Sequence, residues 1–139
     1  MDRAQAGSKV FGQAVTPLKR LWEELDAILT EAGLTRDVKT IYVSYTSQGL
    51  NVVAAAHPGA DYLELALALP ADFDHPDLVD AVHLKWRTLP IAVHLTPDQG
   101  IPSYLPKLVK DAITAAPHIE PRAVEDFKRY ESRRTRRGS

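Results

Sequence analysis

The spacing of hydrophobic positions predicts a helix near the start of the chain. Thr16 suits an N-cap, and Pro17 suits the first helical position, where no N–H group is needed. Apolar side chains then recur three or four positions apart over residues 18–29, as they do on one face of an amphipathic helix. Gly33 is a candidate C-cap. Residues 1–16 show no sustained period, and we expect a loose lead-in with a short helical turn at most.

After Gly33 the hydrophobic pattern changes to alternation, which is typical of strands. Thr40–Ser47 and Leu50–His57 are rich in β-branched, aromatic and small residues, and a Gln-Gly pair between them suits a turn. Tyr62–Leu69 contains residues that also favour helix. Its four leucines occupy every second position, however, and would lie on one side of an extended chain, so we predict a third strand.

The second half of the chain predicts more strand and then helix. Residues 71–81 form a polar, acidic connection with one helical turn after Pro76, and Val82–Arg87 and Leu89–Thr96 suggest one or two further strands. Apolar residues from 105 to 113 then follow helical spacing.

Two starts for this helix remain open. Residues 96–99 resemble a capping box, but Gly100 and Pro102 would interrupt a helix begun there, and Ser103 is the alternative. The helix should end at Ala116, which precedes a proline. A last polar helix should open at Pro121.

This order of elements predicts an α+β fold. Strands joined by short turns pair antiparallel, and two amphipathic helices can cover one face of the resulting sheet. We therefore expect a two-layer sandwich with four or five antiparallel strands, two helices on one face and a C-terminal polar helix. The single domain should span residues 17–117, and residues 118–139 should form the last helix and an arginine-rich tail.

Composition narrows the class of protein. The chain has 139 residues, a hydrophobic fraction of 45% and a charged fraction of 25%, as in ordinary globular domains. The absence of cysteine excludes disulfides, thiol nucleophiles and thiolate metal sites. No apolar run is long enough to span a bilayer, and the first 15 residues lack the apolar core of a secretory signal. We expect a cytoplasmic protein that does not contact a membrane.

Charge is distributed unevenly along the chain. The net charge is −1, but residues 1–127 carry 11 basic and 17 acidic side chains, whereas residues 128–139 carry six basic side chains and one acidic one. Four guanidinium groups fall within five positions, at Arg133, Arg134, Arg136 and Arg137. Such a tail can bind a phosphate backbone or serve as a solubilising end.

A second set of residues combines aromatic rings with positive charge. Aromatic and basic side chains on an open sheet face can stack on bases and hold phosphates. The candidate nucleic-acid-binding residues outside the tail are Lys39, Tyr42, Lys85 and Arg87, with Trp86 and Tyr45 close by in sequence. Tyr42 and Tyr45 are an odd number of positions apart, so they should point to opposite faces of one strand, and one of them should pack in the core.

Histidines and carboxylates provide the candidates for metal binding or acid–base chemistry. The acidic connection holds Asp72, Asp74, His75 and Asp77, a short group of oxygen and nitrogen ligands without the spacing of an EF-hand. His83 and His94 lie in predicted strands and are candidates for a pair on one face, whereas His57 and His118 neighbour prolines and should be exposed in turns. Glycine-rich phosphate loops, nucleophile elbows and His-Glu-x-x-His motifs do not occur.

The chain resembles a small bacterial domain of unknown function. Residues 39–45 are similar to its K-x-Y-I-A-Y opening strand, residues 63–69 to its Leu-rich strand, and residues 80–86 to an acidic connection that leads to a tryptophan. The closing strand and helix match residues 91–95 and 104–113. This domain occurs alone or at the C-terminus of predicted transport proteins, some with nuclease-like N-terminal parts. Thr46 and Arg87 depart from its usual pattern.

A more distant resemblance is to frataxin-like bacterial iron chaperones. It implies an acidic ridge, for which the candidates are Glu23, Glu24, Asp26, Glu31 and Asp37. Three functions therefore stay open. The first is a non-catalytic module without a cofactor that binds nucleic acid or another protein and that can pair as a homodimer. The second is an iron or divalent-metal chaperone, and the third is an enzyme whose base is the pair His83 and His94.

Overall fold

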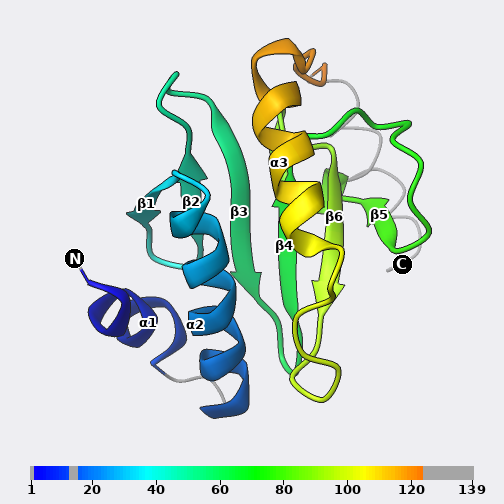
Figure 1. Cartoon of the computed structure of the whole chain (residues 1–139). Helices are drawn as coiled ribbons and strands as arrows, with labels where there is room; N and C mark the ends of the chain where they lie inside the picture. Colours follow the sequence, from blue (N-terminus) through cyan, green and yellow to red (C-terminus); the bar gives the residue numbers. More distant parts are fainter. Residues whose placement is uncertain (1, 13–15, 124–139) are drawn as a thin grey trace, which may run out of the picture.

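The computed structural model describes residues 2–12 and 16–123 and shows an α+β fold (Figure 1). Its six strands form one antiparallel sheet in the order β1-β2-β3-β4-β6-β5. The strands are β1 (Thr35–Val38), β2 (Val43–Thr46), β3 (Val52–Pro58), β4 (Leu63–Leu67), β5 (Leu78–Asp80) and β6 (Ile91–Leu95). The described part also contains the helices α1 (Arg3–Phe11), α2 (Thr16–Glu31) and α3 (Leu105–Ala115), with short 3₁₀ turns η1 (Val82–Leu84) and η2 (Ala116–His118).

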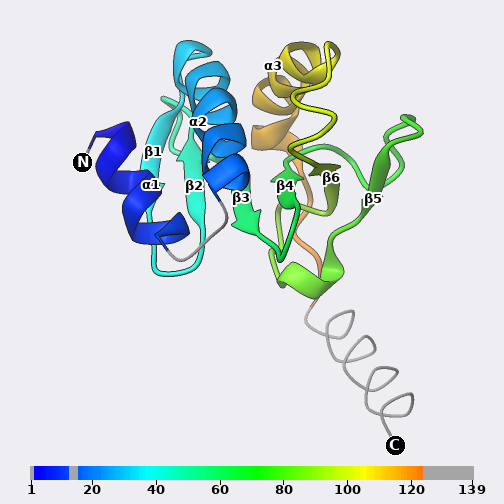
Figure 2. The same ribbon diagram turned by 90° about the horizontal axis from the view of Figure 1, so that it is seen from below.

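The two predicted amphipathic helices lie side by side on one face of the sheet (Figures 1 and 2). The four alternating leucines at 63, 65, 67 and 69 are fully buried and belong to the core beneath these helices. This segment therefore forms a strand, as its alternation predicted. Its leucines occupy every second position because only one side of β4 faces α2 and α3. Burial of the twelve leucines of this core supplies much of the driving force for the packing.

The sheet is larger than the sequence predicted. Strands β1 and β5 at its two edges are additional to the four or five expected, and they are only four and three residues long. Val82–Arg87 was predicted as a strand, which was wrong: its first residues form η1, and Lys85 has a left-handed backbone with φ of 63°. The strand prediction failed because this segment crosses the sheet instead of joining it.

Residues 1–16 were expected as a loose lead-in, but the structure shows helix α1 there. Asp2 caps its first turn, accepting a hydrogen bond from the backbone N–H of Gln5, while the Gln5 side chain accepts from the backbone of Asp2. This reciprocal capping box satisfies donors that a helix start otherwise leaves open. Helix α1 packs beside α2 near the β1 edge (Figure 2). The polar helix expected from Pro121 falls mostly on residues 124–139, outside the described residues.

The second face of the sheet, opposite the helices, is lined by small side chains at its centre. Ser44, Ala55, Ala66 and Ala92 are cross-strand neighbours on β2, β3, β4 and β6. Because these side chains are short, the connection 81–90 and residues 116–119 pack directly on them and form a second, smaller apolar cluster. Figure 2 shows this connection on the side of the sheet away from α2 and α3. None of the described helices is both long and apolar enough to cross a membrane.

Candidate functional site

Three polar residues form a row across the second face of the sheet. His57 on β3 is the cross-strand partner of Glu64 on β4, and Glu64 is the partner of His94 on β6. Since Leu63 and Leu65 point toward the helices, strand alternation directs the side chain of Glu64 to the opposite face. Glu64 is only 4% exposed, so its carboxylate needs partners there.

Two imidazoles satisfy this carboxylate. Nε2 of His83 lies 2.8 and 2.9 Å from the two oxygens of Glu64, and Nε2 of His94 lies 2.6 Å from Oε2. Because an ionised carboxylate only accepts hydrogen bonds, both Nε2 atoms carry a proton. Burial by itself would raise the pKa of Glu64, but the hydrogen bonds from His83 and His94 outweigh it and hold the pKa below its ordinary value. Glu64 is therefore ionised at neutral pH.

The 3₁₀ turn η1 brings His83 to this row. The Asp80 side chain accepts a hydrogen bond from the backbone N–H of Val82 at 2.7 Å, which starts the turn, and Lys85 ends it in the left-handed conformation. His83 and Trp86 are three positions apart, and they contact adjacent strands: His83 binds Glu64, and the indole N–H of Trp86 donates to Nε2 of His57 at 3.1 Å. These two bonds hold the connection 81–90 on the sheet.

Aromatic rings surround His57. The Tyr42 ring lies 5.1 Å from the His57 ring and 5.2 Å from the Trp86 ring, centroid to centroid. Burial outweighs the opposing effect of the Glu64 charge and lowers the pKa of His57 to about 4. His57 is therefore neutral at pH 7, and its Nε2 is free of a proton and able to accept from Trp86. The expectation that His57 would be exposed in a turn was wrong, because β3 extends through it.

Two adjoining clefts open beside this cluster. One, of about 430 Å³, is lined by His57, Tyr62, Glu64 and His83. The other, of about 390 Å³, is lined by Tyr42, His57, His83, Lys85 and Trp86. Both clefts share the residues Ile41, His57, His83 and Leu84, so they are continuous along the second face. Gly59 permits this arrangement, since a Cβ atom there would lie 2.5 Å from the Tyr62 ring.

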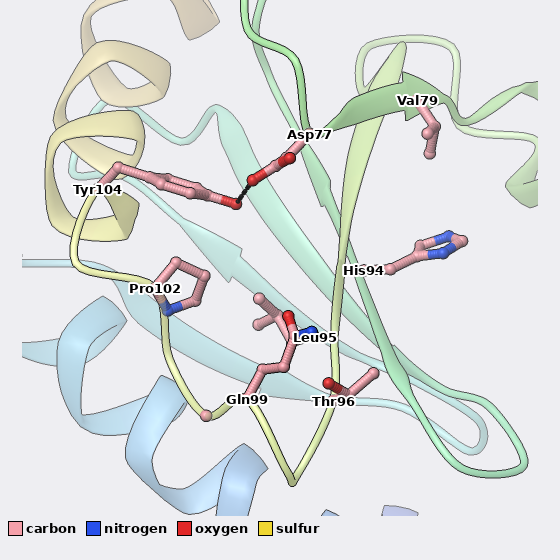
Figure 3. Close-up of a pocket in the computed structure, with 9 residues that line it drawn as sticks. Asp77, Val79, His94, Leu95, Thr96, Gln99, Pro102 and Tyr104 are labelled. Atoms are coloured by element: carbon pink, nitrogen blue, oxygen red, sulfur yellow. Dashed lines mark hydrogen bonds between the residues drawn. The ribbon is translucent and has the colours of Figure 1, made fainter.

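His94 lies at the border of a further depression of about 450 Å³ near α3 (Figure 3). In this depression the Tyr104 hydroxyl donates to Asp77 at 2.7 Å, and Leu95 and Gln99 lie below them. The His94 ring projects from the other side of β6 than Leu95, as alternation along the strand requires. It is 48% exposed and stacks on Tyr62 with 5.0 Å between ring centroids.

The structure brings together only part of the predicted nucleic-acid-binding set. Tyr42 and Lys85 line the same cleft, and Tyr45 lies on the other face in the core, as its spacing from Tyr42 predicted. Lys39 is exposed in the β1–β2 hairpin and forms an ion pair with Asp37 at 3.0 Å. Arg87 lies apart from that cleft, where its Nε donates to the backbone carbonyl of Arg122 at 2.8 Å. Arg133, Arg134, Arg136 and Arg137 fall outside the described residues.

The candidate metal ligands of the acidic connection do not form a site. Within residues 2–12 and 16–123, no group of three or more histidine, aspartate or glutamate side chains is arranged to hold a metal ion. Of the four candidates, Asp77 accepts from Tyr104, and His75 stacks on the Tyr104 ring and accepts from the backbone N–H of Asp77. Asp72 and Asp74 are exposed.

The expected acidic ridge is also interrupted. Asp26 was expected on an exposed helix face with its acidic neighbours, but it is completely buried and bound by Arg3, Arg36 and Tyr45. A ridge that presents Asp26 to iron is therefore wrong for this chain.

Sequence reasoning identified His83 and His94 as a pair but missed the group that joins them. Glu64 is the one charged residue within the Leu-rich segment 63–69, and the same alternation that placed the leucines in the core places it on the second face. A carboxylate in a strand that is buried on both sides requires hydrogen-bond donors. The single glutamate among these leucines was therefore the sequence signal that could have pointed to histidine partners.

The neutral state of His57 predicts a pH effect on stability. Because its folded-state pKa is about 4, below the ordinary 6.5, the unfolded chain binds a proton more readily than the folded chain between these values. The free energy of unfolding should fall as pH drops from 6.5 to 4, by less than about 1.4 kcal/mol per pH unit because the ring is partly exposed. Urea unfolding at pH 7, 6 and 5 should show a shallower fall for His57→Gln, which still accepts from Trp86 but does not titrate. Parallel pH curves for both proteins would contradict this account.

Comparison with known proteins adds no relative: no protein-family model, curated protein or solved structure matches this chain. The resemblance to the bacterial domain and to frataxin-like chaperones stays a prediction from the sequence.

Proposed function

We propose that this protein binds single-stranded nucleic acid through the cleft formed by Tyr42, His57, Lys85 and Trp86. The proposal depends on one observation: these residues come from three separate segments of the chain and line one cleft of about 390 Å³ on the face opposite the helices. Bases of any sequence stack on aromatic side chains, and a cation beside them binds the phosphate.

The arrangement of the rings supports this choice over a purely structural role. Tyr42 is partly exposed although it contacts both His57 and Trp86. Lys85 is exposed and is placed at the cleft by its left-handed backbone. A stacking surface with an adjacent charge suits an unpaired strand, whose bases are free to stack on it.

The arginine tail provides the long-range attraction in this proposal. Residues 1–127 have an excess of acidic side chains, so the body alone repels a polyanion at a distance. Four arginines at 133, 134, 136 and 137 offset this repulsion when they neutralise phosphates. Binding should therefore weaken with salt, with a contribution to the log–log slope of about 0.7 for each phosphate neutralised on a single strand.

The test is a salt series of fluorescence anisotropy with labelled, mixed-sequence 20-nucleotide DNA and RNA. Replacing the four tail arginines with glutamine should lower the salt slope by roughly 2–3. Tyr42→Leu should weaken binding about tenfold at every salt concentration, because it removes one stacked base. Lys110→Gln, a lysine exposed on α3 over the other face of the sheet, is the matched control and should bind like the parent.

Two results would contradict the proposal. Unchanged affinity in Tyr42→Leu, with thermal unfolding like that of the parent, would remove the cleft from the interaction. Unchanged salt slope in the tail variant would remove the tail.

A further inference from the structure

We infer that the same face cleaves RNA, with His83 and His94 transferring protons on either side of a phosphodiester that crosses Glu64. The inference rests on the proposed function in one respect, since the strand must lie along the second face. It adds a reaction and a substrate class, because only a strand with 2′-hydroxyl groups can react in this way.

The arrangement of the two imidazoles on one carboxylate is the main argument. His83 and His94 both donate through Nε2 to Glu64, at 2.8 Å and 2.6 Å, which fixes the orientation of both rings. Their Nδ1 atoms have no hydrogen-bond partner among the described residues. The side chains are 36% and 48% exposed, although the carboxylate that holds them is buried. The two rings therefore present a ring nitrogen to a ligand, while their other nitrogen is used for positioning.

Two imidazoles on one carboxylate can supply both proton-transfer groups of one reaction. Cleavage of RNA at its 2′-hydroxyl needs one general base and one general acid, and histidine is the side chain that most often serves in these roles. His83 and His94 can therefore supply one group each.

The path of the strand follows from the clefts. His83 lines both clefts beside Tyr42, Lys85 and Tyr62, and the exposed His94 ring stacks on Tyr62, which lines one of these clefts. A strand on the second face can therefore meet both rings, while the Glu64 side chain that holds them is only 4% exposed. Lys85 lines the same cleft as His83 and places a positive charge beside it.

The reaction balances without a metal ion or a cofactor. Nδ1 of neutral His83 takes the proton of the 2′-hydroxyl, and the 2′ oxygen forms a bond to phosphorus. The bond from phosphorus to the 5′ oxygen breaks, and this oxygen takes the proton from Nδ1 of protonated His94. The products are a 2′,3′-cyclic phosphate and a 5′-hydroxyl end, and a proton exchanged through water restores the pair. Glu64 is a positioning residue, because it acts only through the two rings.

The experiment uses the full-length protein and a labelled deoxyoligonucleotide that contains one ribonucleotide, in buffer with EDTA. We expect cleavage at the ribonucleotide only, with cyclic-phosphate and 5′-hydroxyl ends. His83→Gln and His94→Gln should each lower the rate at least about 100-fold, the range for loss of a general acid or base. His118→Gln, which removes an exposed histidine that lines a separate cleft and neither of the clefts beside His83, is the matched control and should retain the parent rate. Equal cleavage by parent, His83→Gln and His94→Gln would reveal a contaminating nuclease and overturn the inference.

Binding is measured separately with the same oligonucleotide carrying a 2′-O-methyl group at the single ribonucleotide, which cannot react. Tight binding of this probe without cleavage of the ribonucleotide would overturn the inference and leave the proposed function standing. Failure to bind it would overturn both. A thermal unfolding transition like that of the parent shows that His83→Gln and His94→Gln are folded. If His83→Gln does not fold, His94→Gln decides the question, because His94 lies on an exposed position of β6.

Glu64→Gln distinguishes positioning from a merely structural role. Glutamine retains the shape of the side chain and can still accept a hydrogen bond, but it does not stabilise a protonated imidazole. The cleavage rate should therefore fall in Glu64→Gln while binding of the 2′-O-methyl probe persists, whereas a merely structural role would lower both together. An unchanged cleavage rate in this variant would contradict the role assigned to Glu64.

Discussion

Replacing Asp26 with alanine is expected to lower the free energy of unfolding by about 3–5 kcal/mol, the range for removal of one partner from a buried ion pair. Asp26 is completely buried on α2, and its carboxylate accepts hydrogen bonds from Arg36 on β1, Arg3 on α1 and Tyr45 on β2. Four elements thus meet at one side chain. The alanine variant would leave the Arg36 guanidinium, which is only 15% exposed, without this carboxylate.

Urea unfolding followed by circular dichroism at pH 7 measures this effect. Glu24→Ala on the same helix is the matched control, because Glu24 is exposed and its replacement should change stability by less than about 0.5 kcal/mol. A loss below about 1 kcal/mol in Asp26→Ala would show that the carboxylate does not hold these elements together.

The same contacts predict how the free energy of unfolding depends on pH in acid. Burial would raise the pKa of Asp26, but the hydrogen bonds from Arg36, Arg3 and Tyr45 outweigh it and lower the pKa from 3.8. The stabilisation by this group is therefore complete at pH values above about 4, where the unfolded chain is also ionised, and is lost as pH falls through the lowered folded-state value. The difference between parent and Asp26→Ala should accordingly shrink only in strong acid.

Trp22→Ala is the second substitution with a large expected effect, a loss of about 3–5 kcal/mol. Trp22 is 0% exposed, and its ring lies 5.4 Å from the Phe11 ring of α1, centroid to centroid. Gly7 faces the same indole, since a Cβ atom there would lie 3.2 Å from Cζ3. Removing the indole leaves a cavity between α1 and α2 that neither helix can fill without moving.

Thermal unfolding and hydrogen exchange together test this expectation. Amide exchange over residues 3–11 should accelerate in Trp22→Ala more than exchange in β4, because α1 loses the contacts of Phe11 and Gly7 with the indole. Leu50→Ala serves as the control, since that leucine is 86% exposed and should be replaceable at little cost. Equal acceleration in α1 and β4 would indicate global loss of stability without a special role in holding α1.

The main layers of the fold could be predicted from periodicity, and the edges could not. The leucines of β4 and the apolar stripe of α2 occupy positions that only a one-sided core explains, and both elements were predicted correctly. The sequence predicted a polar connection where β5 lies. This strand has only three residues, it pairs with β6 alone, and Val79 and Asp80 are exposed, so it lacks the alternating apolar pattern of a buried strand. Local propensity contains little information about such a short edge strand.

The residues of the candidate site could likewise be predicted only in part. Spacing placed Tyr42 and Tyr45 on opposite faces, which the structure confirms, and it singled out His83 and His94. It could not show that Glu64 joins the two histidines, because that contact depends on how the connection 81–90 folds back over the sheet. The contact between Glu64 and the two histidines depends on the pairing of β4 with β6 and on the path of the connection, and no local sequence pattern specifies either.

Arg122, close to the end of the described residues, is fixed to the body of the protein by its side chain. Its guanidinium binds both oxygens of Asp80 at 3.1 Å and donates to the carbonyl of Pro90 at 2.9 Å, so the backbone is anchored beside the connection 81–90. Arg133 is eleven residues further on, and eleven residues of any conformation reach no more than roughly 40 Å. In the proposed function, a nucleic acid engaged by the arginines would be tethered near Trp86, and its capture there would become an intramolecular event with a high effective concentration. Two contacts joined in this way would give an avidity that neither would have alone.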